Sequence, residues 1–353
     1  MSLVTLDRSH PDFQLYLRGR LSDGRRAIPQ ITLNPHSERE SVTFRVLSVK
    51  ELNRPALPLV WFRALRPQSL PRPLVPLLVI FAWFVGRGDL DPDLPWLIVL
   101  GLFFLHSALV LRNDIADHLS GADRVRPDRG SRALQNGWLT VDQMEGAAVF
   151  FTASAALCAL PLVFVHPWTL VVTAVAALVA GLGFFLSGRS FKDFIAGEVG
   201  LFLLAGPLLL WGISAALGHP VPYEGWLWSV LWGWWVLLPA HALNLERLLD
   251  DRKMGPRSLA HLWGFDGSRR LLSFWIVVAV LGQAAWILAY SESKILWVGW
   301  EVMMLGGIRL LWILSKVTSP AGSSLARFRR EAEALFALNG LLWTIAAAWE
   351  LFS

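Results

Sequence analysis

The sequence is poor in cysteine and in charged residues. Its 353 residues include one cysteine, Cys158, which excludes an intrachain disulfide. Only 17% of the residues are charged, 54% are apolar and the mean hydropathy is +0.48, which disfavours a water-soluble protein. The sequence also lacks a nucleotide-binding glycine fingerprint, a zinc-type Cys/His cluster and a nucleophile elbow. The net charge of +5 is weak evidence for nucleic-acid binding, and no nucleic-acid partner is expected.

Long apolar runs occupy the chain from Pro71 onward. Nine are separated by short polar segments, at about 72–87, 93–112, 141–165, 168–187, 193–217, 224–246, 270–291, 295–315 and 331–352. Most are close to the roughly 20 residues that a helix needs to cross a bilayer. They are continuously apolar rather than alternating, and backbone groups in lipid must be hydrogen-bonded internally. The predicted fold is therefore all-α, a polytopic membrane protein with nine transmembrane helices.

The distribution of basic residues predicts the orientation of these helices. Eighteen lysines and arginines follow the second, fourth, sixth and eighth runs, whereas the opposite loops carry only Arg87 and Lys294. Basic residues accumulate on the cytoplasmic side of a membrane. We therefore expect a multi-pass protein of the cell membrane with a cytoplasmic N-terminus. The tryptophan-rich segment 226–235 is expected to lie at the membrane interface and face lipid.

The first sixty residues differ from the rest. Segment 41–50 (SVTFRVLSVK) alternates as a strand does, and 21–26 contains an Asp-Gly turn signal. We predict a small cytosolic extension with some β structure at 1–60 and a membrane domain at 61–353. Segment 61–73 (WFRALRPQSLPRP) is predicted to enter the membrane at headgroup depth.

A dense group of charges follows the second apolar run, in LRNDIADHLSGADRVRPDRGSRALQNGWLT (111–140). Asn113 and Asp117 are four residues apart and would share a helix face, with Asp114 beside them and Asp123 in the loop. Such oxygen ligands suit Mg²⁺, which usually takes one or two carboxylates together with substrate phosphates. The arginines that could bind these phosphates are Arg124, Arg126, Arg129 and Arg132. A solvated, positive-inside loop explains the arginines equally well, but it does not explain the aspartates.

A second charged stretch, NLERLLDDRKMGPRSLAHLWG (244–264), follows the sixth run. Glu246 and Asp250 are again four residues apart, and Asp251 comes next. The basic residues that follow are Arg252, Lys253 and Arg257. Both stretches lie on the predicted cytoplasmic side, so they could face each other and bind a diphosphate between metal ions. A diphosphate in a membrane pocket suggests a lipid diphosphate.

These stretches resemble the UbiA superfamily of intramembrane prenyltransferases, over about residues 60–350. Asn113-Asp114-x-x-Asp117, followed by Asp123 and Arg132, is similar to the first motif of the family. More narrowly, NDIADHLSGAD…SRALQNGWLT and WFRALRPQSLPRPLVPLLV resemble the branch that prenylates 1,4-dihydroxy-2-naphthoate in menaquinone synthesis.

The resemblance implies a helical bundle around a central cavity and a Mg²⁺-dependent transfer of a prenyl group from a polyprenyl diphosphate to an aromatic acceptor. Two Mg²⁺ ions would promote ionisation of the diphosphate and leave an allylic cation for attack by the ring. The implied metal ligands are Asn113, Asp114, Asp117, Asp123, Glu246, Asp250 and Asp251. The implied diphosphate-binding residues are Arg124, Arg126, Lys192, Arg247, Lys253 and Arg257. The candidate catalytic residues are Asp117, Asp251 and Arg132.

The second motif departs from the family pattern. Arg247 occupies the position of the earlier aspartate, where a cation cannot be a ligand, while Asp251 matches the later one. Glu246 and Asp250 would form a site shifted by one residue, and a helix turns by about 100° per residue. Phe184 stands where relatives have a tyrosine.

Three polar residues within apolar runs have more than one interpretation. Glu198 is either a functional group or an interfacial side chain paired with Lys192. His106 and His241 are expected to be hydrogen-bonded core residues rather than catalytic bases.

Two alternatives to dihydroxynaphthoate prenylation stay open. One is prenylation of another aromatic acceptor, such as 4-hydroxybenzoate. The other is a non-catalytic membrane protein, a transporter or scaffold with a degenerate prenyltransferase fold.

Overall fold

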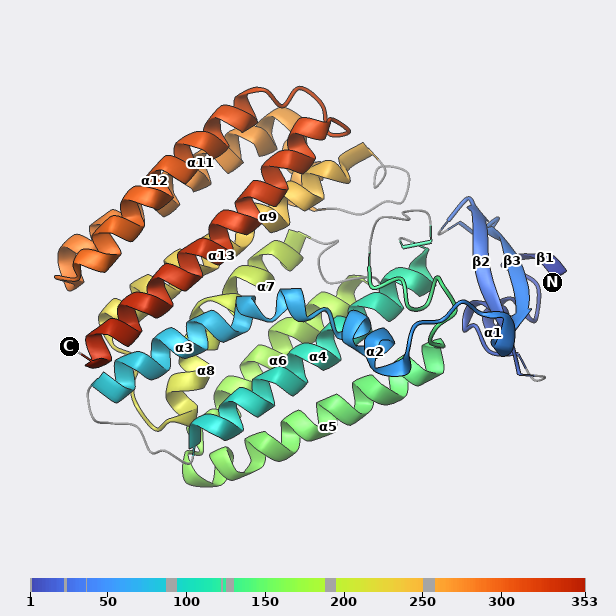
Figure 1. The fold of residues 1–353 in the computed structure, drawn as a ribbon, viewed down its shortest axis with the longest axis horizontal. Coiled ribbons are helices and arrows are strands. Elements are labelled where there is room, and N and C mark those ends of the chain that lie inside the picture. Colours follow the sequence, from blue (N-terminus) through green and yellow to red (C-terminus); the bar gives the residue numbers. More distant parts are fainter. Residues whose placement is uncertain are drawn as a thin grey trace. The chain divides into compact units, whose positions relative to one another are not determined.

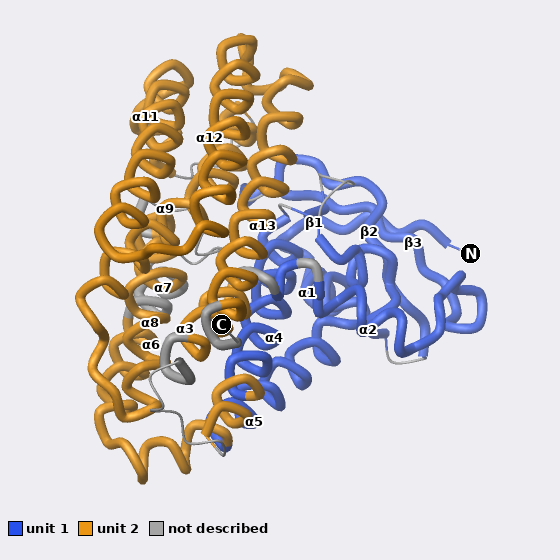
Figure 2. Tube along the Cα trace, turned by 60° about the vertical axis from the view of Figure 1, so that its left-hand side comes forward, with its two compact units in different colours: residues 1–70, 101–157 blue, residues 71–100, 158–353 orange. Residues whose placement is uncertain are grey.

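The structure is a computed structural model that describes residues 2–21, 24–35, 37–86, 94–121, 123–124, 130–187, 195–249 and 258–352. The chain forms two compact units (Figure 2). The first consists of Met1–Leu70 and Gly101–Leu157, and the second of Pro71–Leu100 and Cys158–Ser353. The division expected at residue 60 stays a prediction.

The first unit contains a three-stranded antiparallel sheet of β1 (Ser2–Asp7), β2 (Arg25–Leu33) and β3 (Ser41–Ser48) (Figure 1). β3 lies in the middle and pairs with both neighbours. Its alternate residues, Val42, Phe44 and Val46, are buried against helix α1 (Phe13–Leu17). The strand predicted from the alternation at 41–50 is thereby confirmed, and the fold is helical with a small added sheet.

Helices complete the first unit. They are η1 (Val49–Glu51), α2 (Leu57–Leu65), η2 (Pro67–Ser69), most of α4 (Leu94–Ser120) and most of α5 (Val141–Val165). Val60 and Ala64 of α2 are fully buried in a cluster with Leu111 of α4 and Met144 of α5. The other side of α2 leaves Phe62 exposed, as expected for a segment at the membrane surface.

The second unit is a helical bundle. Its helices are α3 (Pro71–Gly86), α6 (Trp168–Ser187), α7 (Ile195–Ala205), α8 (Pro207–Ala216), α9 (Tyr223–Glu246), α11 (Leu259–Tyr290), α12 (Lys294–Ser315) and α13 (Ser323–Phe352). Helix α9 packs against α7, α11 and α13, and α3 packs against α13 and α8. This arrangement surrounds α9 with apolar neighbours.

Packing around α9 corrects one expectation. Trp228, Trp232 and Trp235 are buried at 1–2% exposure in the largest apolar cluster, whereas we expected the segment to face lipid. Trp226 and Leu227 keep the expected exposure. A hydropathy pattern cannot distinguish the two positions, because a tryptophan is apolar enough for either lipid or a protein core.

The run predicted at 193–217 is divided into α7 and α8 at Gly206. Pro207 begins α8, and a Cβ at Gly206 would lie 2.5 Å from the carbonyl oxygen of Ser229. A Cβ at Gly233 would likewise lie 2.8 Å from the ring of Phe202. These glycines allow the backbones of the broken helix and of α9 to approach closely.

Each of the nine predicted runs coincides with a helix or, at 193–217, with a pair of helices. Among the described residues, six helices are long and apolar enough to cross a membrane, and Pro73–Ala82 and Trp168–Leu178 are shorter apolar helices. A multi-pass membrane protein is therefore supported. Nine crossings and a cytoplasmic N-terminus stay predictions.

Candidate active site

The first motif lies at the C-terminal end of α4 and in the turn that follows. Asp114, Asp117 and Asp123 are buried, at 3%, 3% and 4% exposure. Gly121 ends the helix with φ +92°, a conformation that favours glycine, and the backbone N–H of Asp123 then donates to the carbonyl oxygen of Asp117 (3.1 Å). The turn thus brings Asp123 back towards the last turns of α4, where Asn113 also lies.

Arg66, which lies outside the motif, binds the carboxylate of Asp114. The guanidinium of Arg66 donates to Oδ1 of Asp114, and the backbone N–H of Ser131 donates to Oδ2 (3.3 Å). Arg66 stands in the left-handed region (φ +48°) between α2 and η2. The sequence predicted only a position at headgroup depth for this segment. The only sequence feature that pointed to Arg66 as a site residue was its position in the segment that resembles the entry to the first membrane helix.

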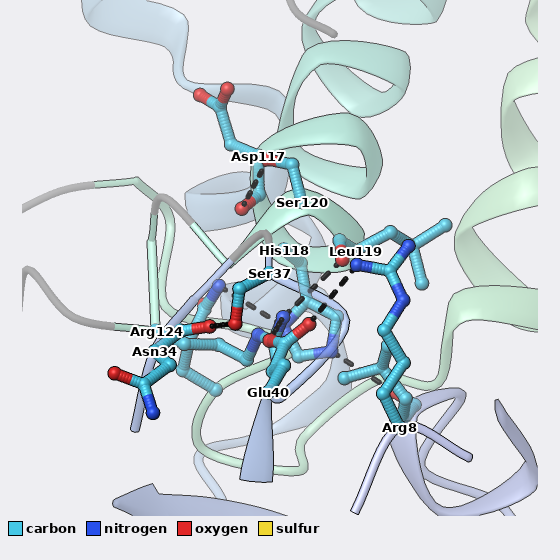
Figure 3. A network of polar contacts seen from close by, with 11 residues as sticks. Arg8, Asn34, Ser37, Glu40, Asp117, His118, Leu119, Ser120 and Arg124 are labelled. Carbon is cyan, nitrogen blue, oxygen red and sulfur yellow. Dashed lines mark hydrogen bonds and ion pairs between the residues drawn. The ribbon is translucent and has the colours of Figure 1, made fainter. Parts of the chain in front are cut away.

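Arg124, a predicted diphosphate ligand, is engaged within the first unit. Its Nη2 donates to Oε1 of Glu40 (2.6 Å) and to the carbonyl oxygen of Leu119 (3.3 Å), as Figure 3 shows. Its side chain has no exposed surface, and Arg8 approaches the other oxygen of Glu40 (3.6 Å). Burial lowers the pKa of Arg124, and the charge of Glu40 opposes that shift. A diphosphate role for Arg124 stays a prediction that requires this ion pair to open.

The ion pair makes a stability prediction. Glu40→Gln leaves the buried charge of Arg124 without its carboxylate, so we expect a loss of about 3 kcal/mol in the free energy of unfolding. Arg8→Ala is the matched control and should cost less than about 1 kcal/mol, because Arg8 is half exposed. Thermal or denaturant unfolding of the detergent-purified protein measures both. Equal effects would show that Arg124 does not depend on Glu40.

The segment after the motif is tied to the same unit by polar contacts. Arg132, at φ +60°, donates from Nη1 to the carbonyl oxygen of Asp123 (2.8 Å). The side-chain amide nitrogen of Gln135 lies 3.3 Å from Nδ1 of His118, and Nε2 of His118 lies 3.0 Å from the carbonyl oxygen of Leu17. An Nε2–H tautomer satisfies both contacts of the imidazole. The N-terminal extension therefore contacts the motif helix directly.

The described part of the second motif ends soon after α9. Glu246 accepts from Nε of Arg329 on α13 (2.9 Å), and Arg329 also binds Glu333 (3.0 Å). Arg247 is 6% exposed. The remaining predicted residues lie outside the described part of the chain: Asp250, Asp251, Arg252, Lys253, Arg257, Arg126, Arg129 and Lys192. Their roles stay predictions.

A buried polar cluster joins α7 to α9. Nδ1 of His241 lies 3.0 Å from both oxygens of Glu198, and Nδ2 of Asn244 donates to Oε1 of Glu198 (2.6 Å). The ring of Trp275 packs edge-on against His241, with 5.2 Å between centroids. Glu198 is thus hydrogen-bonded inside the bundle, and the expectation of a hydrogen-bonded core histidine at 241 is confirmed. Residue spacing in the sequence could not predict that Glu198 of α7 pairs with His241 of α9.

The cluster also makes a stability prediction. Glu198→Ala removes the partner of both His241 and Asn244, so we expect destabilisation by about 2–3 kcal/mol. Glu198→Gln should cost much less, because its amide oxygen can accept from Asn244 while its NH₂ donates to His241 Nδ1. Unfolding curves of the two variants measure the difference. A loss as large for glutamine as for alanine would mean that the charge itself stabilises the cluster.

The carboxylates of the first motif are candidate ligands for a metal ion. Among the described residues, no three acidic, histidine or cysteine side chains converge closely enough to hold a metal ion alone. Mg²⁺ usually takes only one or two carboxylates and completes its shell with water and substrate phosphates. One or two of the buried carboxylates of Asp114, Asp117 and Asp123 therefore have the donor chemistry for a Mg²⁺ ion that is bound together with a diphosphate.

Comparison with known families decides the assignment. Residues 74–340 match the model of the UbiA prenyltransferase family. The chain belongs to this family. A search of curated proteins found no match. The extension that carries the sheet precedes the matched region, so the sheet is additional to the UbiA core.

Solved structures share the UbiA fold of this chain at low sequence identity. A UbiA homolog from Archaeoglobus fulgidus bound to DMAPP and Mg²⁺ has a TM-score of 0.55 at 16% identity, over 81% of this chain and 99% of that one. Another structure of a UbiA homolog from Archaeoglobus fulgidus has a TM-score of 0.59 at 16% identity, over 83% of this chain and 100% of that one. Digeranylgeranylglyceryl phosphate synthase has a TM-score of 0.56 at 15% identity, over 82% and 98%.

Proposed function

We propose that this protein is a Mg²⁺-dependent intramembrane prenyltransferase that moves a prenyl group from a polyprenyl diphosphate to an aromatic acceptor. The observation that carries the proposal is the set of buried carboxylates of Asp114, Asp117 and Asp123 at the end of α4, within a UbiA family chain. The fold is shared with structures of a UbiA homolog from Archaeoglobus fulgidus bound to DMAPP and Mg²⁺ and bound to GPP and Mg²⁺.

The first motif and Asp251 would hold the metal and the diphosphate. Asp117 and Asp123 would supply carboxylate oxygens to the metal, and Arg66 and Ser131 orient Asp114. Mg²⁺, when bound, neutralises charge that develops on the leaving diphosphate. Arg132 would add a guanidinium fork to the phosphates, as arginine does in phosphate sites. The apolar bundle would exclude water from the carbon that the acceptor attacks.

We propose 1,4-dihydroxy-2-naphthoate as the first acceptor to test, because the stretches around the first motif and before α3 resemble that branch. An electron-rich ring is the chemical requirement, and 4-hydroxybenzoate meets it too. Arg247 in the second motif and Phe184 on α6 differ from the branch pattern and make another acceptor the main competitor.

Product formation tests the proposal. The purified protein, in nanodiscs, is incubated with radiolabelled geranyl diphosphate or a longer prenyl diphosphate and a panel that includes both acceptors. We expect a labelled, extractable product with Mg²⁺ and one of the acceptors, and none with EDTA. Absence of product with every acceptor and chain length would contradict catalysis and favour the scaffold or transporter alternative.

A further inference from the structure

A cavity of about 580 Å³ lies in the first unit. Residues of strands β2 and β3 line one side of it, and residues 132–138, which follow the first motif, line another. Its volume is within the range of small-molecule sites. Arg45 and Arg132 line it, together with the amide of Gln135. Glu51 is the one carboxylate among these described lining residues, and it already accepts from the backbone N–H of Ser48 (3.2 Å). The lining is therefore cationic.

The strand register places another cation on this side of the sheet. β3 turns Phe44 and its other buried residues towards the N-terminal core, so Arg45 and Leu47 lie on the opposite face. Arg45 pairs with Ile28, and Leu47 pairs with Arg26. Arg26 and Arg45 consequently share the face that lines the cavity.

Arg26, Arg45 and Arg54 have no carboxylate partner among the described residues. The Nε atoms of Arg45 and Arg54 are buried and donate to none of the described residues, and neither they nor Arg26 form an ion pair there. Burial lowers the pKa of Arg26, and the like charges of Arg54 and Arg20 lower it further. Clustered, partly buried cations of this kind are stabilised by an anion.

We propose that this cavity is a binding site for a phosphate group, carried either by a soluble phosphate compound or by a phospholipid headgroup. The arginines at the cavity outnumber its one carboxylate, Glu51, which already accepts a hydrogen bond. This excess of positive charge favours a phosphate monoester, with about two negative charges, over a ligand with a single carboxylate. Arg45 and Arg54 belong to the extension and its link to α2, outside residues 74–340 of the family match. Arg132 also belongs to the proposed chemistry of prenyl transfer, so the residues that distinguish this site are Arg45 and Arg54.

The wall of the cavity also offers apolar surface to the remainder of the ligand. Trp138 lines it, with its Nε1 donating to the carbonyl oxygen of Asn53 (3.1 Å) and Arg63 of α2 above its ring (5.5 Å). α2 follows directly and exposes Leu57 and Phe62 at 51% and 59%. A headgroup in the cavity could therefore leave its acyl chains beside α2.

Thermal unfolding of the full-length protein tests the site, in EDTA and without prenyl substrate so that the outcome is independent of prenyl transfer. One arm titrates inorganic phosphate against chloride at constant ionic strength in neutral detergent. The other compares phosphatidylcholine nanodiscs with and without phosphatidic acid. Arg45→Gln and Arg54→Gln are the test variants, and Arg39→Gln, at an exposed position of the same extension, is the matched control.

We expect phosphate or phosphatidic acid to raise the Tm of the wild type and of Arg39→Gln. Arg45→Gln should weaken the apparent affinity by about tenfold or more, because the wall of the cavity loses a charge-assisted hydrogen bond. Arg54→Gln removes a charge near Arg26 and should weaken the affinity by a smaller factor. Stabilisation in the detergent arm assigns a soluble phosphate, and stabilisation by phosphatidic acid alone assigns a headgroup. No stabilisation in either arm, or equal stabilisation in both test variants and the wild type, would overturn the proposal. If Arg45→Gln does not fold, Arg54→Gln, which lies outside the sheet, makes the same comparison.

Discussion

Asp117→Asn should lower the rate of prenyl transfer by at least about 100-fold. Removing one carboxylate from a metal–diphosphate site weakens stabilisation of the leaving group, and about 3 kcal/mol of lost transition-state stabilisation corresponds to that factor. Asparagine keeps the shape of the buried side chain, so the fold should survive. Initial rates with saturating Mg²⁺ and prenyl diphosphate measure the effect.

Glu292→Gln is the matched control for Asp117→Asn. Glu292 is exposed in the short connection between α11 and α12, and it is expected on the opposite side of the membrane from the motifs. Its substitution should leave the rate unchanged. If Asp117→Asn turns over near the wild-type rate while its unfolding curve is normal, the first motif is not the metal site.

Asp251→Asn should reduce prenyl transfer far more than Glu246→Gln, again by about 100-fold against less than about tenfold. Arg329 on α13 donates to the carboxylate of Glu246 at the end of α9. This contact gives Glu246 a structural role that does not require a metal. Asp251 lies outside the described residues, and the sequence resemblance matches it to the later family aspartate. Rates of the two variants, measured against Mg²⁺ concentration, decide between a site at Asp251 and one shifted to Glu246.

Arg247 extends this comparison. A guanidinium near the diphosphate can supply fixed positive charge where the family has a metal ligand. Arg247→Asp should therefore raise the Mg²⁺ concentration at which the rate of prenyl transfer is half-maximal. Small and equal effects at Glu246, Arg247 and Asp251 would mean that the second motif no longer binds phosphate, and would support the non-catalytic alternative.

Local patterns in the sequence predicted the helices and the first motif. Continuous apolar runs specify helices because lipid leaves the backbone no other partner, and the four-residue spacing of Asn113 and Asp117 already implied a shared helix face. The strand at β3 followed from alternation. These features depend on residues close together in the chain, so a single sequence carries them.

Contacts between distant residues could not be predicted in the same way. The pairing of Arg124 with Glu40 joins residues 84 positions apart, and Arg66 with Asp114 joins residues 48 positions apart. The cluster of Glu198 with His241 depends on the packing of α7 against α9 through Gly206 and Gly233, not on any spacing within either helix. The same dependence on packing explains why buried tryptophans of α9 were expected at the lipid surface.

Metal binding in the presence of an inert substrate analogue tests the central claim most directly. The electron paramagnetic resonance spectrum of Mn²⁺, which substitutes for Mg²⁺, is recorded with wild-type protein, Asp117→Asn and Asp251→Asn, each with and without a non-ionisable prenyl diphosphate analogue. We predict tight Mn²⁺ binding by the wild type only when the analogue is present, and its loss in either variant, because the proposed site takes metal ligands from both motifs. Tight binding that survives both substitutions, or no binding by the wild type with the analogue, would contradict the account.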